Sequence, residues 1–310
     1  MATHPPTICV VGSSNIDLIA RVPRLPRLGE TLIGHSFHTG YGGKGANQAV
    51  MAAKLRARVR MVTKLGRDVF GEDTLRNYRA QGIDTTTVLF DEHTSTGVAP
   101  IFVDDNAQNC IVVVPGANGT LSPGDVDAAR EAILTADLLV CQLEVPLETT
   151  LAAFRVAKSR APGVFTILNP APAAPLPDEL LALTDICAPN ETETELLTGL
   201  PVGTLTEAEA AARQLLARGP KSVIVTMGER GALCVDAGGA QHVPPHRVAA
   251  VDPTGAGDAF IGALAVFLGE GLDLATAARQ ANVVAAMSVT RIGTQASFPG
   301  RAEVDAELGV

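Results

Sequence analysis

The segment Val251-Asp252-Pro253-Thr254-Gly255-Ala256-Gly257-Asp258-Ala259-Phe260 runs directly into an apolar stretch with helical character, Ala259–Leu268. Small residues at 255–257 let the backbone approach a ligand closely. A helix that begins here adds unpaired N–H groups and the positive end of its dipole. The segment therefore predicts an anion site at a helix start, suited to a phosphoryl group in transfer.

Asp258 falls in the first turn of this predicted helix. One interpretation is structural, because acidic residues stabilise helix starts. The other is functional, because a carboxylate beside an anion site is placed to take a proton from a substrate hydroxyl. The spacing alone leaves both interpretations open.

Outward from this segment, short apolar runs alternate with helical stretches. Strands are predicted at Ile8–Gly12, Val59–Leu65, Leu138–Leu143, Phe165–Leu168, Ile186–Ala188 and Val223–Thr226. Helices are predicted at Lys44–Arg56, at Gly71–Gln81, from Ser122 onward, from Thr206 (a capping box with Glu209) to about Arg218, and at Asp273–Thr290. This alternation predicts an α/β fold with a mostly parallel sheet flanked by helices, and ligands at the carboxyl ends of the strands.

Two stretches break the alternation. Leu18–Phe37 has strand-like residues interrupted by two prolines, and Thr96–Val103 and Cys110–Val114 are strand candidates around a turn at Asp104–Ala107. They predict a small separate sheet, with lid segments at about 18–40 and 96–117, that covers the site or pairs with another subunit. Edge strands of the main sheet are the alternative.

The composition narrows the class of protein. The 310 residues are 46% apolar and 18% charged, which suits a single α/β domain over residues 1–310. The net charge of −9 argues against nucleic acid or an anionic membrane as the main partner. No apolar run reaches the roughly 18 residues of a membrane span, and Met1–Thr7 lacks signal-peptide features. The five cysteines form no CxxC pair, which favours buried free thiols in the cytoplasm.

The run Asp252–Phe260 resembles the signature of the ribokinase family of sugar kinases, and so does Gly40–Ala49 (GYGGKGANQA). The resemblance extends from Gly12 to about Pro299. It implies a three-layer fold with a mostly parallel central sheet and a small β-sheet lid, through which two subunits form a homodimer. It also implies ATP-dependent phosphorylation of the 5-hydroxyl of ribose, with Asp258 as the general base and the amides of Gly255, Ala256 and Gly257 as the anion hole.

The resemblance further assigns a sugar site. A carboxylate can accept two hydroxyl hydrogen bonds, and glycines allow close approach of the sugar. Each motif also has a purely structural alternative: a tight turn for the glycine-rich loop, an Asx turn for Asn15 and Asp17, and an exposed strand end for Glu144. The residues that match the family's sugar contacts are Asn15, Asp17, Gly42, Gly43, Lys44, Asn47 and Glu144.

A nucleotide site and two cation sites follow from the same resemblance. Asn190 and Glu193 match a motif that helps place Mg2+ and the nucleotide phosphates, although a helix cap would look the same. Thr226, Gly228 and Gly231 match the nucleotide loop, and Asn282 matches a position near the adenine. Residues matching a monovalent-cation site, usually K+, are Asp252, Thr254, Ser288, Arg291, Gly293 and Ser297, where an ordinary helix exit is the alternative for 288–297.

Other functions remain as alternatives. Deoxyribose, fructose or a nucleoside could replace ribose, although only 4% aromatic residues leave little to stack on a base. A non-catalytic sugar or nucleotide sensor would be expected to lack Asp258 or the glycines at 255 and 257. A dehydrogenase is disfavoured because Gly40–Gly45 lacks GxGxxG spacing and does not follow the first strand.

Overall fold

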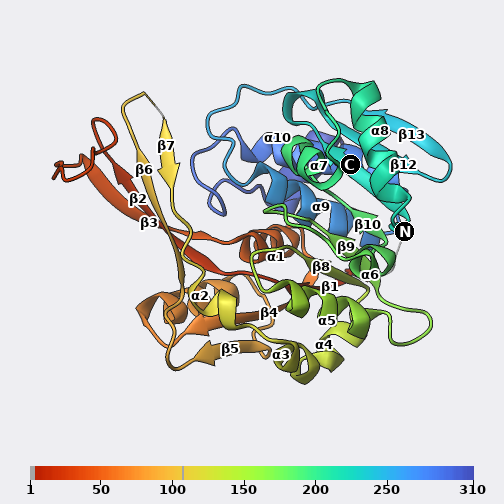
Figure 1. Ribbon diagram of the computed structural model, residues 1–310, viewed down its shortest axis with the longest axis horizontal. Helices are drawn as coiled ribbons and strands as arrows, with labels where there is room; N and C mark the ends of the chain where they lie inside the picture. The colour runs from red at the N-terminus through yellow and green to blue at the C-terminus, as the bar shows by residue number, and fades with distance from the viewer. Residues whose placement is uncertain (1–3, 107) are drawn as a thin grey trace.

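The computed structural model describes residues 4–106 and 108–310, and its main feature is a nine-stranded sheet (Figure 1). The sheet is parallel from β5 through β11, and β12 and β13 are antiparallel at one edge. In spatial order its strands are β13 (Gly239–Val243), β12 (Ala232–Asp236), β11 (Ser222–Thr226), β10 (Ile186–Cys187), β9 (Phe165–Leu168), β8 (Leu138–Cys141), β1 (Thr7–Val11), β4 (Arg58–Gly66) and β5 (Val88–Asp91).

Helices cover both faces of this sheet. Alternation along β1 shows why, since Ile8 and Val10 enter one buried cluster and Cys9 and Val11 enter the other. The first cluster lies under α1 (Lys44–Lys54), α2 (Val69–Ala80), α9 (Ala256–Gly269), α10 (Leu274–Ser288) and α11 (Arg301–Leu308). The second lies under α3 (Pro123–Ala128), α4 (Arg130–Leu134), α5 (Leu147–Ala157), α6 (Asp178–Ala182), α7 (Glu191–Thr198) and α8 (Leu205–Leu216). The predicted mostly parallel α/β fold is confirmed.

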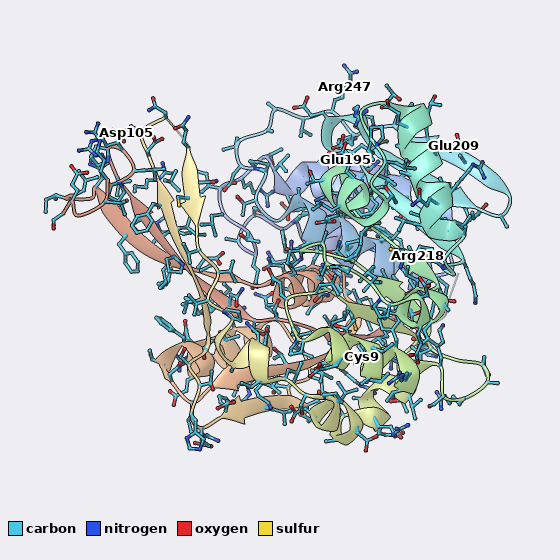
Figure 2. The ribbon with its side chains drawn as sticks, viewed as in Figure 1. Cys9, Asp105, Glu195, Glu209, Arg218 and Arg247 are labelled. Carbon is cyan, nitrogen blue, oxygen red and sulfur yellow. The ribbon has the colours of Figure 1, made fainter. Side chains whose placement is uncertain are left out.

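A second, four-stranded sheet stands to one side of the molecule (Figure 1). Its order is β3 (Ser36–Gly42), β2 (Asn15–Arg21), β6 (Gly97–Val103) and β7 (Asn109–Ile111). The two predicted segments therefore form a sheet of their own, and the alternative of edge strands on the main sheet is wrong. Asp105 lies at its far tip (Figure 2), and Ala107 of the predicted turn lies outside the described residues.

The base of the small sheet lies at the carboxyl end of β1. Asn15, the first residue of β2, pairs in register with Gly42 of β3 and Gly97 of β6. Asn118 Nδ2 donates to Asn15 Oδ1 at 2.8 Å, and Ser14 N donates to Asn118 Oδ1 at 2.8 Å. These contacts place the start of the small sheet beside the edge where ligands are expected.

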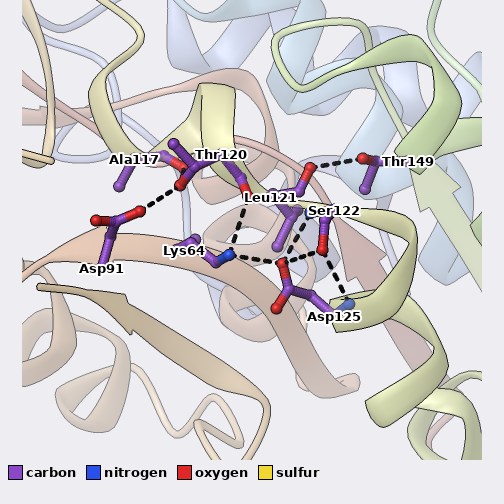
Figure 3. Close-up of polar contacts among 8 residues, drawn as sticks. All are labelled: Lys64, Asp91, Ala117, Thr120, Leu121, Ser122, Asp125 and Thr149. Carbon is purple, nitrogen blue, oxygen red and sulfur yellow. Dashed lines mark hydrogen bonds and ion pairs between the residues drawn. The ribbon is translucent and has the colours of Figure 1, made fainter. Parts of the chain in front are cut away.

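A polar cluster anchors the chain as it returns from the small sheet (Figure 3). Lys64 of β4 donates to Thr120 O at 2.9 Å, in the 3-10 helix η1 (Gly116–Thr120), and to Asp125 Oδ2 at 2.6 Å. Thr120 Oγ1 donates to Asp91 Oδ2 of β5 at 2.7 Å, and Thr149 Oγ1 of α5 donates to Leu121 O at 2.6 Å. One lysine therefore connects β4 with η1 and the start of α3.

One predicted helix start needs a correction. The capping box of α8 is formed by Thr204 and Glu207, whose side chain and backbone N–H groups bond each other reciprocally. Thr206 lies inside the helix. Glu209 lies on the outer surface of α8 (Figure 2), where it pairs with Arg213 at 2.7 Å. Both pairs have the Thr-x-x-Glu spacing, and Leu205 already belongs to the helix, which moves the cap two residues upstream.

Two further observations concern the state of the cysteines and the length of the apolar helices. All five cysteines are unbridged, and four are buried, whereas Cys110 is exposed on β7. Within residues 4–106 and 108–310, no helix is both long enough and apolar enough to cross a membrane.

Candidate active site

The predicted anion site lies at the start of α9. Gly255 is the N-cap with φ 81°, a left-handed conformation that favours glycine, and a Cβ there would lie 2.5 Å from Thr294 Cγ2. Ala256 N donates to Pro253 O at 3.2 Å. Among the described residues, the amides of Gly255 and Gly257 have no hydrogen-bond partner. Of the three predicted anion-hole amides, two are therefore unpaired and one is shared with the backbone.

A cavity of about 190 Å³ opens beside these amides. It lies at the carboxyl ends of β9, β10 and β11 and at the starts of α1, α7 and α9, the edge that the fold predicts for ligands. Its lining residues include many of the predicted ones and some that were not predicted: Lys44, Asn169, Ala171, Ala188, Asn190, Glu193, Thr226, Pro253, Gly255, Ala256, Gly257, Asp258 and Ile261.

Asp258 lines this cavity and is held by α1. Asn47 Nδ2 donates to Asp258 Oδ2 at 2.9 Å, and Gln48 Nε2 donates to Asp258 Oδ1 at 3.0 Å. The helices come this close because Gly262 faces α1, where a Cβ would lie 2.6 Å from Gln48 O. Asp258 is 7% exposed, so its hydrogen bonds are largely shielded from water.

Glu144 is tied to the start of α1. Its Oε2 accepts from Ser13 Oγ at 2.5 Å and from Lys44 N at 2.9 Å. A carboxylate there is favoured by the positive end of the helix dipole. The predicted sugar contacts Glu144 and Lys44 thus meet at the N-terminus of one helix, although they are 100 residues apart in the chain.

Several charges meet around Asp258. Burial, together with the nearby Glu144 and Asp258 carboxylates, raises the pKa of Asp17 to about 7. The Asp258 carboxylate raises the pKa of Lys44 against the opposing effect of burial, and Glu144 and Glu193 add to this rise. Lys44 is therefore a cation with three carboxylates around it, which suits a site where a negative phosphoryl group must come close to carboxylates.

The glycines of the second motif allow close packing against the strand ends. Gly43 has φ 87°, and a Cβ there would lie 2.7 Å from Asn15 N. A Cβ at Gly42 would overlap the Asp17 carboxylate. These contacts bring together Asn15, Asp17, Gly42 and Gly43, which were predicted from separate parts of the sequence. Neither of the two polar side chains among them is part of the cavity lining.

Asn190 and Glu193 form the start of α7. Asn190 Oδ1 accepts from Glu193 N at 2.8 Å, and Glu193 Oε2 accepts from Asn190 N at 2.8 Å, so the helix-cap interpretation is confirmed. Both residues also line the cavity, and burial raises the pKa of Glu193. Thr226 joins them through a β-bridge to Asn190. The same two side chains therefore cap α7 and line the cavity.

The remaining predicted nucleotide residues lie outside the cavity lining. Gly228 starts the 3-10 helix η2 (Gly228–Arg230) after β11, and Gly231 is its C-cap with φ 84°. Asn282 of α10 donates from Nδ2 to Pro244 O at 3.2 Å, just beyond β13.

The predicted monovalent-cation residues come from two segments that the structure joins. Asp252 Oδ1 accepts from Thr254 N at 3.0 Å, and Asp252 Oδ2 accepts from Gly293 N at 2.9 Å. Val289 O accepts from Asp252 N at 3.1 Å. The hydroxyls of Ser288 and Ser297 donate to backbone carbonyls in their own turns, and the Arg291 side chain pairs with Glu303.

Sequence reasoning did not single out three buried amide side chains close to Asp258. Gln48 bonds Asp258 directly, Gln142 Nε2 donates to Gln48 Oε1 at 2.6 Å, and Gln48 Nε2 also donates to Asn169 Oδ1 at 3.1 Å. A signal was present for the two glutamines. Gln48 follows Asn47 within Gly40–Ala49, and Gln142 lies two residues before Glu144.

Comparisons with known proteins agree with this geometry. A model of the pfkB family carbohydrate kinases matches residues 6–301. Deoxyribokinase of Salmonella typhi is 48% identical over 293 residues, covering 94% of this chain and 95% of that protein. Ribokinase of Mus musculus is 42% identical, covering 97% and 94% respectively. The structure of Arabidopsis thaliana ribokinase complexed with ribose and ATP has a TM-score of 0.92 at 33% identity, covering 99% of this chain and 100% of that one. The chain therefore belongs to the pfkB family of carbohydrate kinases, and ribokinases are among its relatives.

Proposed function

We propose that this protein transfers the γ-phosphoryl group of ATP to the 5-hydroxyl of D-ribose, giving ribose 5-phosphate and ADP. The observation that carries the proposal is the Asp258 carboxylate, which lines a cavity next to the unpaired amides of Gly255 and Gly257. A sugar alcohol and a terminal phosphate would meet between these groups. A sensor would need neither the base nor the amides, so their presence favours the enzyme.

In the proposed reaction, Asp258 accepts the proton of the 5-hydroxyl while the hydroxyl oxygen bonds to the γ-phosphorus. The bond from that phosphorus to the bridging oxygen breaks, and ADP leaves with its electron pair. The amides of Gly255 and Gly257, with Ala256 beside them, stabilise negative charge on the transferred group. Lys44 offsets the repulsion between this group and the nearby carboxylates. Positioning and electrostatics supply most of the rate in such transfers.

The residues present fit a magnesium–nucleotide complex. Glu193 and Asn190 line the cavity and carry oxygen atoms, and Mg2+ prefers oxygen ligands while keeping several waters. Among the described residues, no group of three or more acidic, histidine or cysteine side chains could hold a metal by itself. We therefore propose that Glu193 acts through water and the phosphates. Bound Mg2+ would neutralise phosphate charge during the transfer.

A monovalent-cation site beside the anion hole also fits. One Asp252 oxygen accepts from an N–H of its own turn and the other from the loop that contains Gly293, and the Ser288 and Ser297 hydroxyls keep free lone pairs because they act as donors in their own bonds. Arg291 would contribute only its carbonyl, because its side chain pairs with Glu303. K+ held there by Asp252, Thr254, Gly293 and their neighbours would fix the loop that leads into α9.

The sugar is the finer part of the proposal. Asp17 and Glu144 supply carboxylate oxygens, and Asn15 and Asn47 supply amides, which together suit a neutral polyol. The deoxyribokinase relative at 48% identity makes 2-deoxy-D-ribose the second candidate. Ribose is favoured by the pair of acceptors on Asp17, which matches two vicinal hydroxyls, whereas deoxyribose offers one hydroxyl fewer.

We further propose that the small sheet acts as a lid and pairs two subunits into a homodimer. Its support is an apolar surface on this sheet and on residues 112–114, which follow β7. Phe37 is 64% exposed and Val112 is 54% exposed, and Ile111, Val113 and Val114 are also exposed. We place the enzyme in the cytoplasm, in keeping with its unbridged cysteines.

The test is an ADP-release assay with ribose, 2-deoxyribose, fructose and common nucleosides as acceptors. We expect the highest kcat/KM for ribose. In Asp258→Asn, kcat falls by about 10²-fold or more while ATP and sugar still bind, because the base is lost and the other proposed contacts to sugar and nucleotide remain. Turnover near that of the parent in this variant would remove Asp258 as the base. Transfer to no polyol at all would overturn the enzyme assignment.

A further inference from the structure

Each carboxylate oxygen of Asp258 is the last acceptor in a line of hydrogen-bonded amide side chains, most of which are buried. On the first line, Gln142 Nε2 donates to Gln48 Oε1 at 2.6 Å, and Gln48 Nε2 donates to Asp258 Oδ1 at 3.0 Å. The second proton of the Gln48 amide goes to Asn169 Oδ1 at 3.1 Å, so every polar atom of the Gln48 side chain is used.

The second line comes from another part of the fold. Asn77 Nδ2 of α2 donates to Gln295 Oε1 at 2.9 Å, and Gln295 Nε2 donates to Asn47 Oδ1 at 3.0 Å. Asn47 Nδ2 then donates to Asp258 Oδ2 at 2.9 Å. Lys54, at the end of α1, fixes this loop by donating to Gln295 O at 2.9 Å.

The direction of both lines is set by Asp258. An ionised carboxylate only accepts hydrogen bonds, so each neighbouring amide must present its NH2 group to it. With its NH2 group directed at Asp258, each amide has its oxygen on the side away from Asp258, where this oxygen accepts an N–H from the next side chain. Every amide therefore donates toward Asp258. A protonated Asp258 would have to donate its own O–H to an amide oxygen. The hydrogen bonds along one of the two lines would then have to reverse their donor–acceptor direction.

Burial makes these contacts strong. Gln142 is 0%, Gln48 1%, Asn47 5% and Gln295 7% exposed, and hydrogen bonds in series polarise one another in such surroundings. Gln142 Oε1 has no hydrogen-bond partner among the described residues. The one polar contact of the Gln142 side chain is thus its donation into this line, which is hard to explain by stability alone.

The charges around Asp258 explain what the amides offset. Besides burial, the Asp258 charge contributes to the raised pKa values of Asp17 from β2 and Glu193 from α7, and it is the main cause of the raised pKa of Lys44 from α1. A buried ionised carboxylate in this position needs hydrogen-bond donors at both of its oxygens. The amides supply them, because the positive ends of their dipoles point at the two Asp258 oxygens.

We propose that Gln48, Gln142 and Gln295 are positioning residues which hold Asp258 ionised and aim its free lone pairs at the substrate hydroxyl. The proposal rests on Asp258 as the general base. Asn47 takes part in the same way, in addition to its proposed contact with the sugar. The amides touch no substrate and act only through the carboxylate.

The experiment measures kcat against pH at saturating sugar and ATP, where the profile reports groups in the ternary complex. Gln48→Met and Gln295→Met keep the side-chain length and remove the amide. Gln48→Met loses a hydrogen bond to the carboxylate itself, so the acid limb of the profile moves up by about one pH unit and kcat below it falls about tenfold. Gln295→Met acts through Asn47, so we expect a smaller shift in the same direction. Sugar and ATP affinities measured by calorimetry stay within about threefold.

Two further variants sharpen the result. Gln142→Met removes an outer amide that does not touch Asp258, and we expect a smaller shift in the same direction. This variant keeps the test valid if Gln48→Met folds poorly. Gln214→Met is the matched control, because Gln214 is an exposed glutamine on α8 that donates to Thr198 O far from the cavity. Its pH profile is expected to match the parent.

The outcomes separate the two proposals. If Asp258→Asn is nearly inactive and the glutamine variants keep the parent's pH profile and kcat, the positioning role is refuted while the base survives. If Asp258→Asn keeps its turnover, the proposed function fails first. A shift of the acid limb in Gln48→Met and Gln295→Met, absent in Gln214→Met, supports both.

Discussion

The spacing of α1 and α9 should control catalysis, and Gly262→Ala tests this. In the parent, α1 lies so close to Gly262 that a Cβ there would be 2.6 Å from Gln48 O and 2.8 Å from Met51 Cβ. Ordinary van der Waals contact begins at 3.4 Å, so the helices must separate by about 0.8 Å. Backbone atoms cannot rotate away, which makes this displacement hard to avoid.

The displacement moves Asn47 and Gln48 away from Asp258. Their hydrogen bonds of 2.9 and 3.0 Å would lengthen beyond 3.5 Å, where little attraction remains. A misplacement of about 1 Å at a reacting group can lower the rate about 10²-fold, so we expect kcat to fall between about 30- and 100-fold. Overpacking costs about 1–3 kcal/mol, and alanine in a helix returns about 0.5–1 kcal/mol, so the melting temperature falls by only a few degrees.

The assay combines kcat from ADP release with thermal unfolding. Gly124→Ala is the control, because Gly124 also lies in a helix and its Cβ would meet only Ser122 Oγ, at 3.6 Å. We expect parental kcat in the control. A Gly262→Ala protein that turns over within about threefold of the parent would refute the idea that this helix contact sets the geometry of Asp258.

Three further predictions concern charge and cations. Because the pKa of Asp17 is raised to about 7 in the folded protein, the unfolded chain releases this proton more easily, and stability falls as the pH rises from about 4 toward 7. Asp17→Asn should therefore raise the melting temperature more at pH 8 than at pH 5, and an equal change at both would contradict the assignment. Glu144→Gln keeps an acceptor for Lys44 N but loses the charge, so the sugar KM should rise about tenfold with a smaller change in kcat, and an unaltered KM would count against a sugar contact. Exchange of K+ for Na+ should lower kcat, whereas indifference to the exchange would remove the cation site.

The sequence was most informative at positions where the backbone geometry requires glycine. Glycines at 255 and 257 next to Asp258, and at 42 and 43 next to Lys44, signal close approach and a helix start, and the structure has α9 and α1 beginning there. Strand positions followed from apolar runs, because a sheet that is buried on both faces has strands made mostly of apolar residues. The small sheet was predicted from the break in alternation.

The supporting amides were harder to predict. Gln48, Gln142 and Gln295 come from three distant parts of the chain, and only the fold places the end of β8 and the loop after α10 against α1. A glutamine has no preferred role in sequence, since it is common on surfaces and in helices. The cap of α8 was misplaced for a related reason, because two Thr-x-x-Glu pairs overlap and only the backbone decides between them.

The position of the base of the small sheet has a consequence for sugar binding. Asn15, Asp17 and Gly42 sit where β2 and β3 leave the body of the protein, while Asp258 belongs to α9. Three of the residues proposed to contact the sugar therefore lie at the base of the small sheet, whereas Asp258 belongs to the main body of the fold. The sheet extends from these residues to its far tip, near Asp105 (Figure 2). We expect a protein bound at that tip to alter sugar binding only by shifting the base of the sheet, without contacting the sugar itself.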